Sequence, residues 1–170
     1  MIAEWTRGQW ALRVVAALGP VGAVLATAPA GVPPKPWLVG LVALLSVGHA
    51  RLPESPVGIL AMGAVIVWWG VAFRDGLHAW ALPAAAALLA SHVAALLAAY
   101  GPDRLGVDPA TLRRWLVRAA VAFSLAPAVW ALALVLRGRD EAPGVWVAGL
   151  AVALAATVVA TVALTREPGE

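Results

Sequence analysis

Six apolar runs, each near the length that a helix needs to cross a bilayer, constrain this chain more than any other feature. A membrane-spanning helix takes about 20 mostly apolar residues, with a range of roughly 17–25. Inside a bilayer the backbone must satisfy its own hydrogen bonds, and a helix does so within a single segment. The runs therefore predict an all-α protein. They cover residues 10–28, 36–50, 56–73, 78–100, about 112–136, and 144–164.

The overall composition excludes several classes of protein. Of the 170 residues, 62% are hydrophobic and 12% are charged. A soluble domain is about 45–50% apolar and about 25% charged, so a soluble enzyme, a disordered chain and a DNA-binding domain are all excluded. The basic residues lie in short gaps between apolar runs, which favours a role in orientation over nucleic-acid binding. The chain has no cysteine, which excludes disulfides and thiolate sites.

The gaps between the runs are too short to hold a folded extramembrane domain. We therefore expect one integral membrane domain over residues 1–170, a polytopic transmembrane helical bundle of about six spans. Either of two alternatives would reduce the number of membrane spans to five. Run 36–50 is short enough to form a re-entrant hairpin. Run 10–28 leads into Ala28-Pro29-Ala30, which is similar to the end of a secretory signal, but the position of Pro29 does not suit cleavage by a signal peptidase.

The longest gap, residues 101–111, carries a helix-start signal. Asp108 is followed directly by Pro109. An aspartate accepts hydrogen bonds from the free backbone N–H groups of a first turn, and proline is favoured at the first helical position. This pair predicts that the fifth helix begins in the membrane interface, ahead of its buried part.

Basic residues predict the orientation of the chain. With the N-terminus inside, eight basic residues fall on the inner side and four on the outer side. The inner set is Arg7, Arg13, Arg51, Arg104, Arg113, Arg114, Arg118 and Arg166, and the outer set is Lys35, Arg74, Arg137 and Arg139. Loops rich in Lys and Arg stay in the cytoplasm, so we expect both termini there. Abundant alanine, glycine, proline and arginine indicate a bacterial genome, and hence a bacterial cytoplasmic (inner) membrane.

Three basic residues at the start of the fifth run are candidate contacts for anionic lipid headgroups: Arg113, Arg114 and Arg118. The plainer interpretation is that they only set the topology. Arg13 and Arg118 lie about one turn inside their helices, and we expect both side chains to snorkel to the inner headgroups.

Few polar side chains lie inside the spans, and none of them is Asp, Glu or Lys. The central candidate for an intramembrane polar site is the pair Ser91 and His92, joined by His49 at a similar predicted depth. One interpretation is a substrate, haem or proton site, with the two imidazoles ligating a haem or metal if their helices touch. The other is interhelical hydrogen bonding, the usual role of polar side chains in membrane bundles. We assign no metal and no cofactor.

Small residues recur along the fourth run, where Ala87, Ser91, Ala95 and Ala99 follow one another every four positions. Small residues let helix backbones approach closely, so this stripe predicts a helix-packing face. Two roles are open for this stripe: packing inside the bundle, and docking onto another membrane protein. Four glycines are expected to be further points of close approach between helices: Gly19, Gly22, Gly58 and Gly63.

No catalytic motif is present, so we assign no catalytic residue and do not expect an enzyme. The leading hypothesis is a non-enzymatic membrane subunit or accessory protein that acts through helix–helix contacts. Its partners would be the lipid bilayer and either a membrane protein or further copies of this chain, with no nucleic acid. The alternative is a small-solute transporter, or the substrate-binding membrane subunit of one. A haem-binding membrane protein ranks third.

Overall fold

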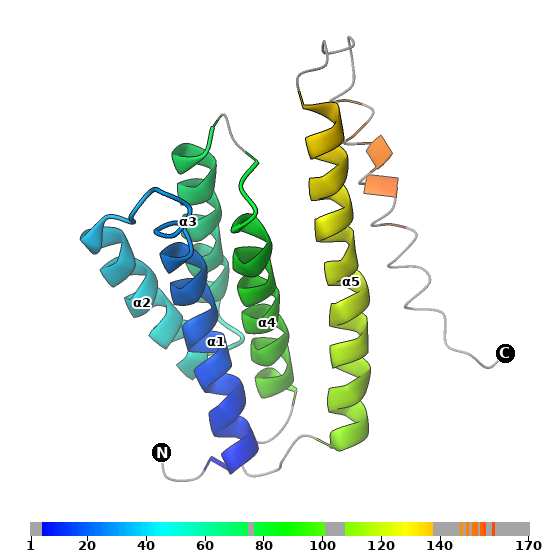
Figure 1. Ribbon diagram of the computed structural model, residues 1–170. Coiled ribbons are helices and arrows are strands. Elements are labelled where there is room, and N and C mark those ends of the chain that lie inside the picture. The colour runs from blue at the N-terminus through cyan, green and yellow to red at the C-terminus, as the bar shows by residue number, and fades with distance from the viewer. Residues whose placement is uncertain are drawn as a thin grey trace, which may run out of the picture. The chain divides into compact units, whose positions relative to one another are not determined.

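A computed structural model describes residues 5–74, 77–100 and 108–137, together with positions 147, 149, 151, 152, 154, 155 and 158. This part of the chain is helical, without strands. Its helices are α1 (Arg7–Leu25), α2 (Pro36–Arg51), α3 (Val57–Ala72), α4 (Ala81–Ala99) and α5 (Pro109–Leu136) (Figure 1). The chain divides into two compact units, Met1–Val135 and Leu136–Glu170. The expected sixth run, 144–164, lies for the most part outside the described residues.

Three helices are long and apolar enough to cross a membrane: α1, α4 and α5. The other two, α2 and α3, are apolar but have 16 residues each, or about 24 Å of helix against a hydrocarbon core of about 30 Å. For α2 this shortness was expected from the sequence. For α3 it corrects the clear span expected over 56–73, because the backbone is not helical on either side of residues 57–72. The described residues thus account for three of the six expected spans.

Local side-chain chemistry fixes where two of the helices begin. The Thr6 hydroxyl accepts a hydrogen bond from the Gln9 backbone N–H at 3.3 Å, so α1 begins three residues before the expected run. The Asp108 carboxylate accepts from the Thr111 backbone N–H at 3.0 Å, and α5 begins at Pro109. The helix start predicted from Asp108 and Pro109 is confirmed.

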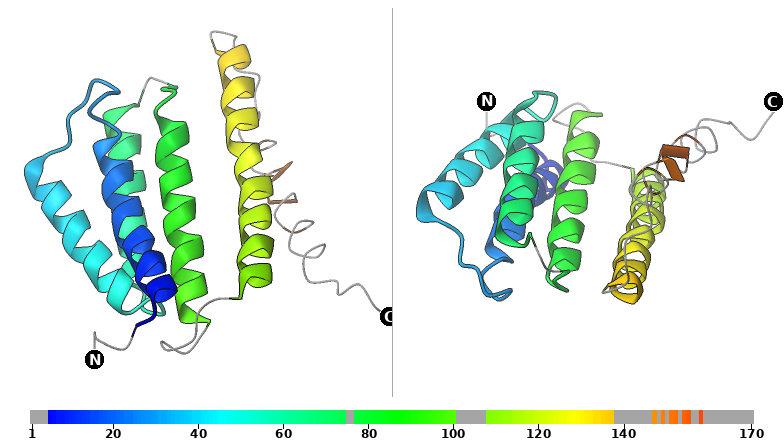
Figure 2. Two further views of the ribbon diagram at one scale, coloured as in Figure 1. Left: turned by 60° about the horizontal axis from the view of Figure 1, so that its bottom comes forward. Right: turned by 90° about the horizontal axis from the view of Figure 1, so that it is seen from above.

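The first four helices alternate in direction, and α1 packs against each of the other three (Figures 1 and 2). Its most extensive contact is with α4, followed by α2 and then α3. We call the end where α1 and α3 begin and α2 and α4 finish the N-terminal end of the bundle. The opposite end is the distal end.

One face of α1 is buried along its whole length. Its residues are Gln9, Arg13, Ala16, Pro20 and Ala23. They alternate steps of four and three, which places them in a single stripe facing the neighbouring helices. The distal half of this stripe joins an apolar core formed by Ala23, Val24, Leu38, Val42, Val65 and Ala84. The half of the stripe nearer the N-terminal end contains the buried polar residues Gln9 and Arg13, and the candidate site lies beside them.

Two tryptophans of α3 tie the distal end of α1 to the bundle. The indole N–H of Trp69 donates to the Ala23 carbonyl at 2.9 Å, and that of Trp68 donates to the Thr27 hydroxyl at 3.3 Å. Thr27 is itself buried and donates to the Val24 carbonyl. The Ala23 carbonyl is one of the last four of α1, which lack intrahelical partners, so the Trp69 bond satisfies a group that the helix leaves free.

Close contact between α1 and α4 depends on Gly19. A Cβ atom at this position would lie 2.5 Å from both the Ala87 carbonyl oxygen and the Ser91 Cβ. Gly22, one turn further along α1, has open space at the same point. Of the two points of close approach expected in this helix, only Gly19 therefore touches a neighbouring helix.

We expect Gly19→Ala to lower the free energy of unfolding by about 1–3 kcal/mol, because the added methyl group pushes α4 away. Gly22→Ala is the matched control, with the same chemical change on the same helix. It should be neutral or stabilising by up to about 1 kcal/mol, because alanine favours the helix. Thermal unfolding in detergent, followed by tryptophan fluorescence, measures both. Equal shifts in the two variants would contradict the close α1–α4 packing.

Candidate functional site

Arg13 is the buried cation of the bundle's N-terminal end, with only 6% of its surface exposed. Its Nη1 donates to the Ala50 carbonyl oxygen at 2.7 Å and to the Arg51 carbonyl oxygen at 3.2 Å. These are carbonyls of the last turn of α2, which have no intrahelical partners. The guanidinium of α1 thus caps the C-terminus of α2, where the helix dipole favours a positive charge.

An aromatic ring covers the same guanidinium. The Arg13 Cζ lies 4.1 Å from the centroid of a Trp5 ring, and Trp5 in turn packs edge-on against Trp10. A ring face attracts a cation, and more strongly where water is excluded. The expectation that Arg13 snorkels to the headgroups is therefore wrong. Its charge instead meets carbonyl oxygens of α2 and the Trp5 ring inside the protein.

A second interhelical bond arises from the proline in the middle of α1. Proline has no backbone N–H, so Pro20 leaves the carbonyl of Ala16 without its usual partner four residues on. The Ser91 hydroxyl of α4 donates to that carbonyl at 2.8 Å, and Ser91 is fully buried. The structure thus places Ser91 in a bond between two helix backbones.

The two histidines of the candidate polar site have different surroundings. His49 is buried, and its imidazole packs against the backbone of Gly58 on α3, where a Cβ would overlap the ring. His92 is exposed on α4, yet it is near enough to His49 for the two imidazoles to interact electrostatically. The described residues contain no group of three or more His, Cys, Asp or Glu side chains that could hold a metal.

Several buried polar atoms near this end make no hydrogen bond with the described residues. They are the side-chain amide of Gln9, the hydroxyl of Ser46 and both ring nitrogens of His49. An unsatisfied buried polar group costs about 1–3 kcal/mol, so such groups usually meet water or a ligand. The N-terminal end of the bundle is therefore the polar part of an otherwise apolar structure.

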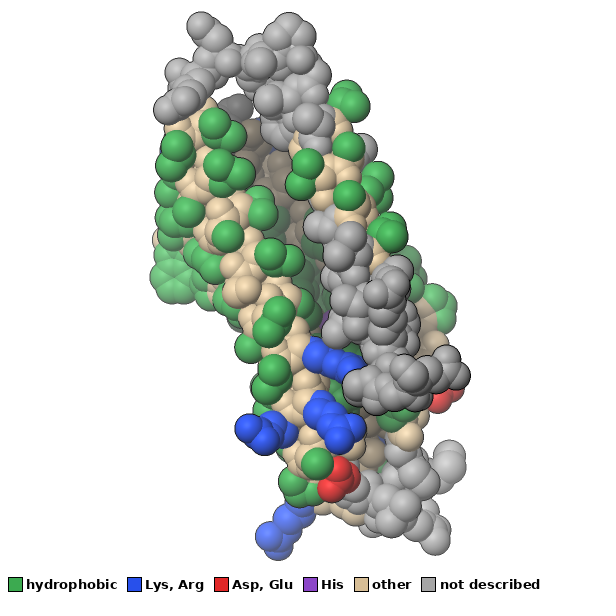
Figure 3. Space-filling model, turned by 90° about the vertical axis from the view of Figure 1, so that its right-hand side faces the viewer, with side chains coloured by type: hydrophobic (Ala, Val, Ile, Leu, Met, Phe, Trp, Pro, Cys, Tyr) green, Lys and Arg blue, Asp and Glu red, His purple; other side chains and the backbone are tan. Residues whose placement is uncertain are grey.

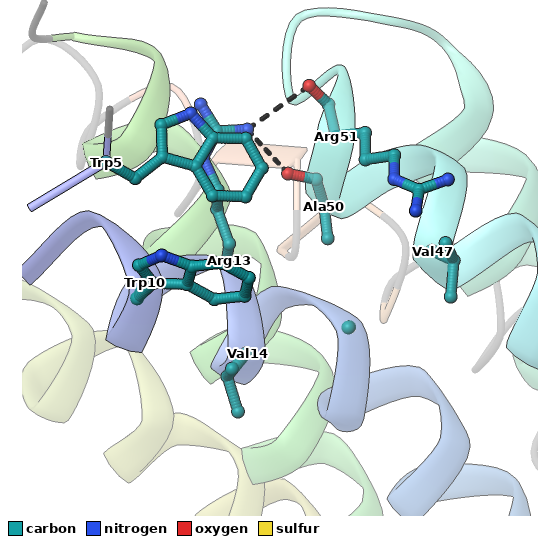
Figure 4. Close-up of a pocket in the computed structure, with 8 residues that line it drawn as sticks. Trp5, Trp10, Arg13, Val14, Val47, Ala50 and Arg51 are labelled. Carbon is teal, nitrogen blue, oxygen red and sulfur yellow. Dashed lines mark hydrogen bonds between the residues drawn. The ribbon is translucent and has the colours of Figure 1, made fainter. Parts of the chain in front are cut away.

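A pocket of about 190 Å³ opens between α1 and α2 beside Arg13 (Figure 4). Its apolar wall is formed by Val14, Ala17 and Val47. Trp5 and Trp10 lie on the α1 side and Arg51 on the α2 side, so both arginines border one small space. Ligand sites for drug-sized molecules measure about 300–1,000 Å³, so this pocket fits a smaller group.

The small-residue stripe of α4 lies against α1 over most of its length. Ala87 packs against the apolar core, Ser91 and Ala95 are buried, and Ala99 is half-buried. Ala95 joins Ala16 and Ala94 in a second small cluster. In the described structure, the stripe is thus occupied by contacts within the bundle.

The three candidate headgroup arginines of α5, Arg113, Arg114 and Arg118, are all exposed near its start. Figure 3 shows Lys and Arg side chains gathered toward one end of this face and hydrophobic side chains along the rest of it. The guanidinium carbon of Arg118 lies 5.9 Å from a Trp115 ring centroid, near the outer limit for a cation–π contact.

Sequence reasoning missed the association of Trp5, Arg13 and the end of α2. Two signals were present: an arginine one turn inside an apolar helix, and a tryptophan eight residues before it. They became interpretable only once α1 and α2 were known to touch at this end. No known protein family, curated protein or solved structure matches the chain, so the site stands on its own geometry.

We expect Arg13→Met to lower the free energy of unfolding by about 2–3 kcal/mol, because two carbonyls of α2 lose a charged donor. Arg7→Met, an exposed change on the same helix, should stay within about 0.5 kcal/mol of the parent. Equilibrium unfolding in detergent micelles compares the two variants. If Arg13→Met proved neutral or stabilising, Arg13 would be a snorkelling side chain and not a cap.

Proposed function

We propose that this protein is a six-span protein of a bacterial cytoplasmic membrane, with both termini in the cytoplasm. In this proposal it is a non-enzymatic subunit or accessory protein that binds a larger membrane protein through α5. The six-span threading follows the apolar runs, and the orientation follows the eight-to-four excess of basic residues on the inner side. The burial of α1 along a whole face favours its retention over cleavage.

The observation that carries the proposal is the exposure of α5. This helix has 28 residues and is long and apolar enough to span a bilayer, yet it has no buried residue. By contrast, α1 and α4 each bury a face within the bundle. The half-buried residues of α5, among them Ala119, Phe123 and Trp130, follow one side of the helix, so its opposite, exposed side is left to contact lipid or a partner helix.

The exposed surface of α5 has the chemistry of a helix-docking face. Ala120, Ser124 and Ala128 are exposed and follow one another every four residues, forming one small-residue stripe. Such stripes let a second helix approach closely, and close packing drives association inside a membrane. Pro127 adds to this, because its missing N–H leaves the Phe123 carbonyl available for a donor from another helix.

An apolar groove supports the alternative, the binding of a small solute. It has a volume of about 560 Å³ and is lined by α1, α4 and α5 within the first unit. Its walls include Leu12, Val15, Leu89, Leu97 and Phe123. The size falls in the range of small-molecule sites, and the lining would suit a hydrophobic solute.

Co-purification from the native membrane tests the partner hypothesis. We expect the tagged protein to recover one membrane protein in a fixed ratio, and Ser124→Leu to reduce that recovery roughly tenfold by separating the helices. Ala122→Leu is the matched control, because residue 122 lies about 200° around the helix from Ala120. Equal recovery with both variants, or a lone monomer stabilised by an added hydrophobic solute, would contradict the proposal.

A further inference from the structure

We propose that the pocket between α1 and α2 binds the phosphate headgroup of one anionic phospholipid, with Arg51 as its main charged contact. This inference is independent of α5 and of any protein partner, and it needs only that the bundle lies in a membrane. It also differs from the headgroup contacts expected at the start of the fifth run, which belong to another helix.

The lining of the pocket divides into a charged part and an apolar wall. The charged residues of the lining are Arg13 and Arg51, and the apolar wall includes Val14, Ala17 and Val47. Figure 4 shows Trp5 and Trp10 on one side of the space and Arg51 on the other. This division matches a phospholipid, whose charged phosphate adjoins its apolar chains.

The charges at this end favour an anion. The described charged residues of α1–α4 at the N-terminal end are Arg7, Arg13, Arg51 and Glu54. Arg13 is already held by the carbonyls of α2, which fixes its position beside the pocket. Arg51 is exposed, and its side chain has no carboxylate partner among the described residues. An arginine donates in a planar fork that fits a phosphate oxygen pair.

The pocket is too small for a whole lipid, and its volume and its place near the end of α2 favour a headgroup. About 190 Å³ is below the size of ordinary small-molecule sites, so the acyl chains must lie outside, along the surface of α1 and α2. Tryptophans are enriched at the membrane–water interface, which is where a headgroup lies. The last turn of α2, which contributes Ala50 and Arg51, is at the end of its helix and hence near that interface.

Native mass spectrometry of the whole protein from mixed phosphatidylglycerol and phosphatidylcholine micelles tests this inference. We expect one phosphatidylglycerol to stay bound, and Arg51→Gln to weaken its retention roughly fivefold to tenfold. Arg51→Lys should retain most of the binding, since it keeps the charge. Arg7→Gln, the same charge change at the same end but outside the pocket, should have no effect.

Three outcomes would overturn the inference. Equal retention of phosphatidylcholine would show that only the apolar surface binds lipid. Equal losses for Arg7→Gln and Arg51→Gln would show a diffuse charge effect without a site. Thermal stabilisation by inorganic phosphate as large as that by phosphatidylglycerol would show a site for a free anion. Because none of these measurements involves α5, failure here leaves the partner hypothesis unaffected, and the reverse also holds.

Discussion

The buried guanidinium of Arg13 is the interaction on which the N-terminal end of the bundle depends. A charged side chain inside a membrane helix is expensive unless its charge is compensated within the protein. Here the carbonyls at the end of α2 and the ring of Trp5 supply that compensation. The same bonds also satisfy α2, because the carbonyls of its last turn need hydrogen-bond donors. One bonded group therefore joins α1 to the end of α2.

Helices α3 and α4 are joined to α1 by the same principle, a backbone carbonyl that lacks its intrahelical partner. Pro20 frees the Ala16 carbonyl, and Ser91 of α4 donates to it. Near the distal end, the Ala23 carbonyl accepts from Trp69 of α3. Each of α2, α3 and α4 thus makes a hydrogen bond to α1 or accepts one from it. With little hydrophobic driving force between helices in lipid, such bonds and the close contact at Gly19 specify the packing.

Much of this architecture could be predicted from the sequence, and the limits of that prediction are physical. Run length predicted helices, and the pair Asp108 and Pro109 predicted where α5 begins. Run 56–73 predicted the bounds of α3 to within one residue at each end, but the 16-residue helix is shorter than the span expected there. The role of Arg13 was also predicted wrongly. An arginine near a helix end looks the same in sequence whether it reaches headgroups or a neighbouring helix, and only the α1–α2 contact distinguishes the two.

The central claim is that Arg13 is held by the protein and not by the lipid. Solid-state NMR in phosphatidylglycerol bilayers tests it directly, with ¹⁵N in the arginine side chains, ¹³C in the alanine carbonyls and ³¹P in the lipid. The N···O distance of 2.7 Å predicts a measurable through-space dipolar coupling between the Arg13 Nη1 and the Ala50 carbonyl carbon. That coupling should disappear in Arg13→Met. A missing Ala50 coupling, with the Arg13 nitrogens coupled instead to lipid phosphorus alone, would contradict the account.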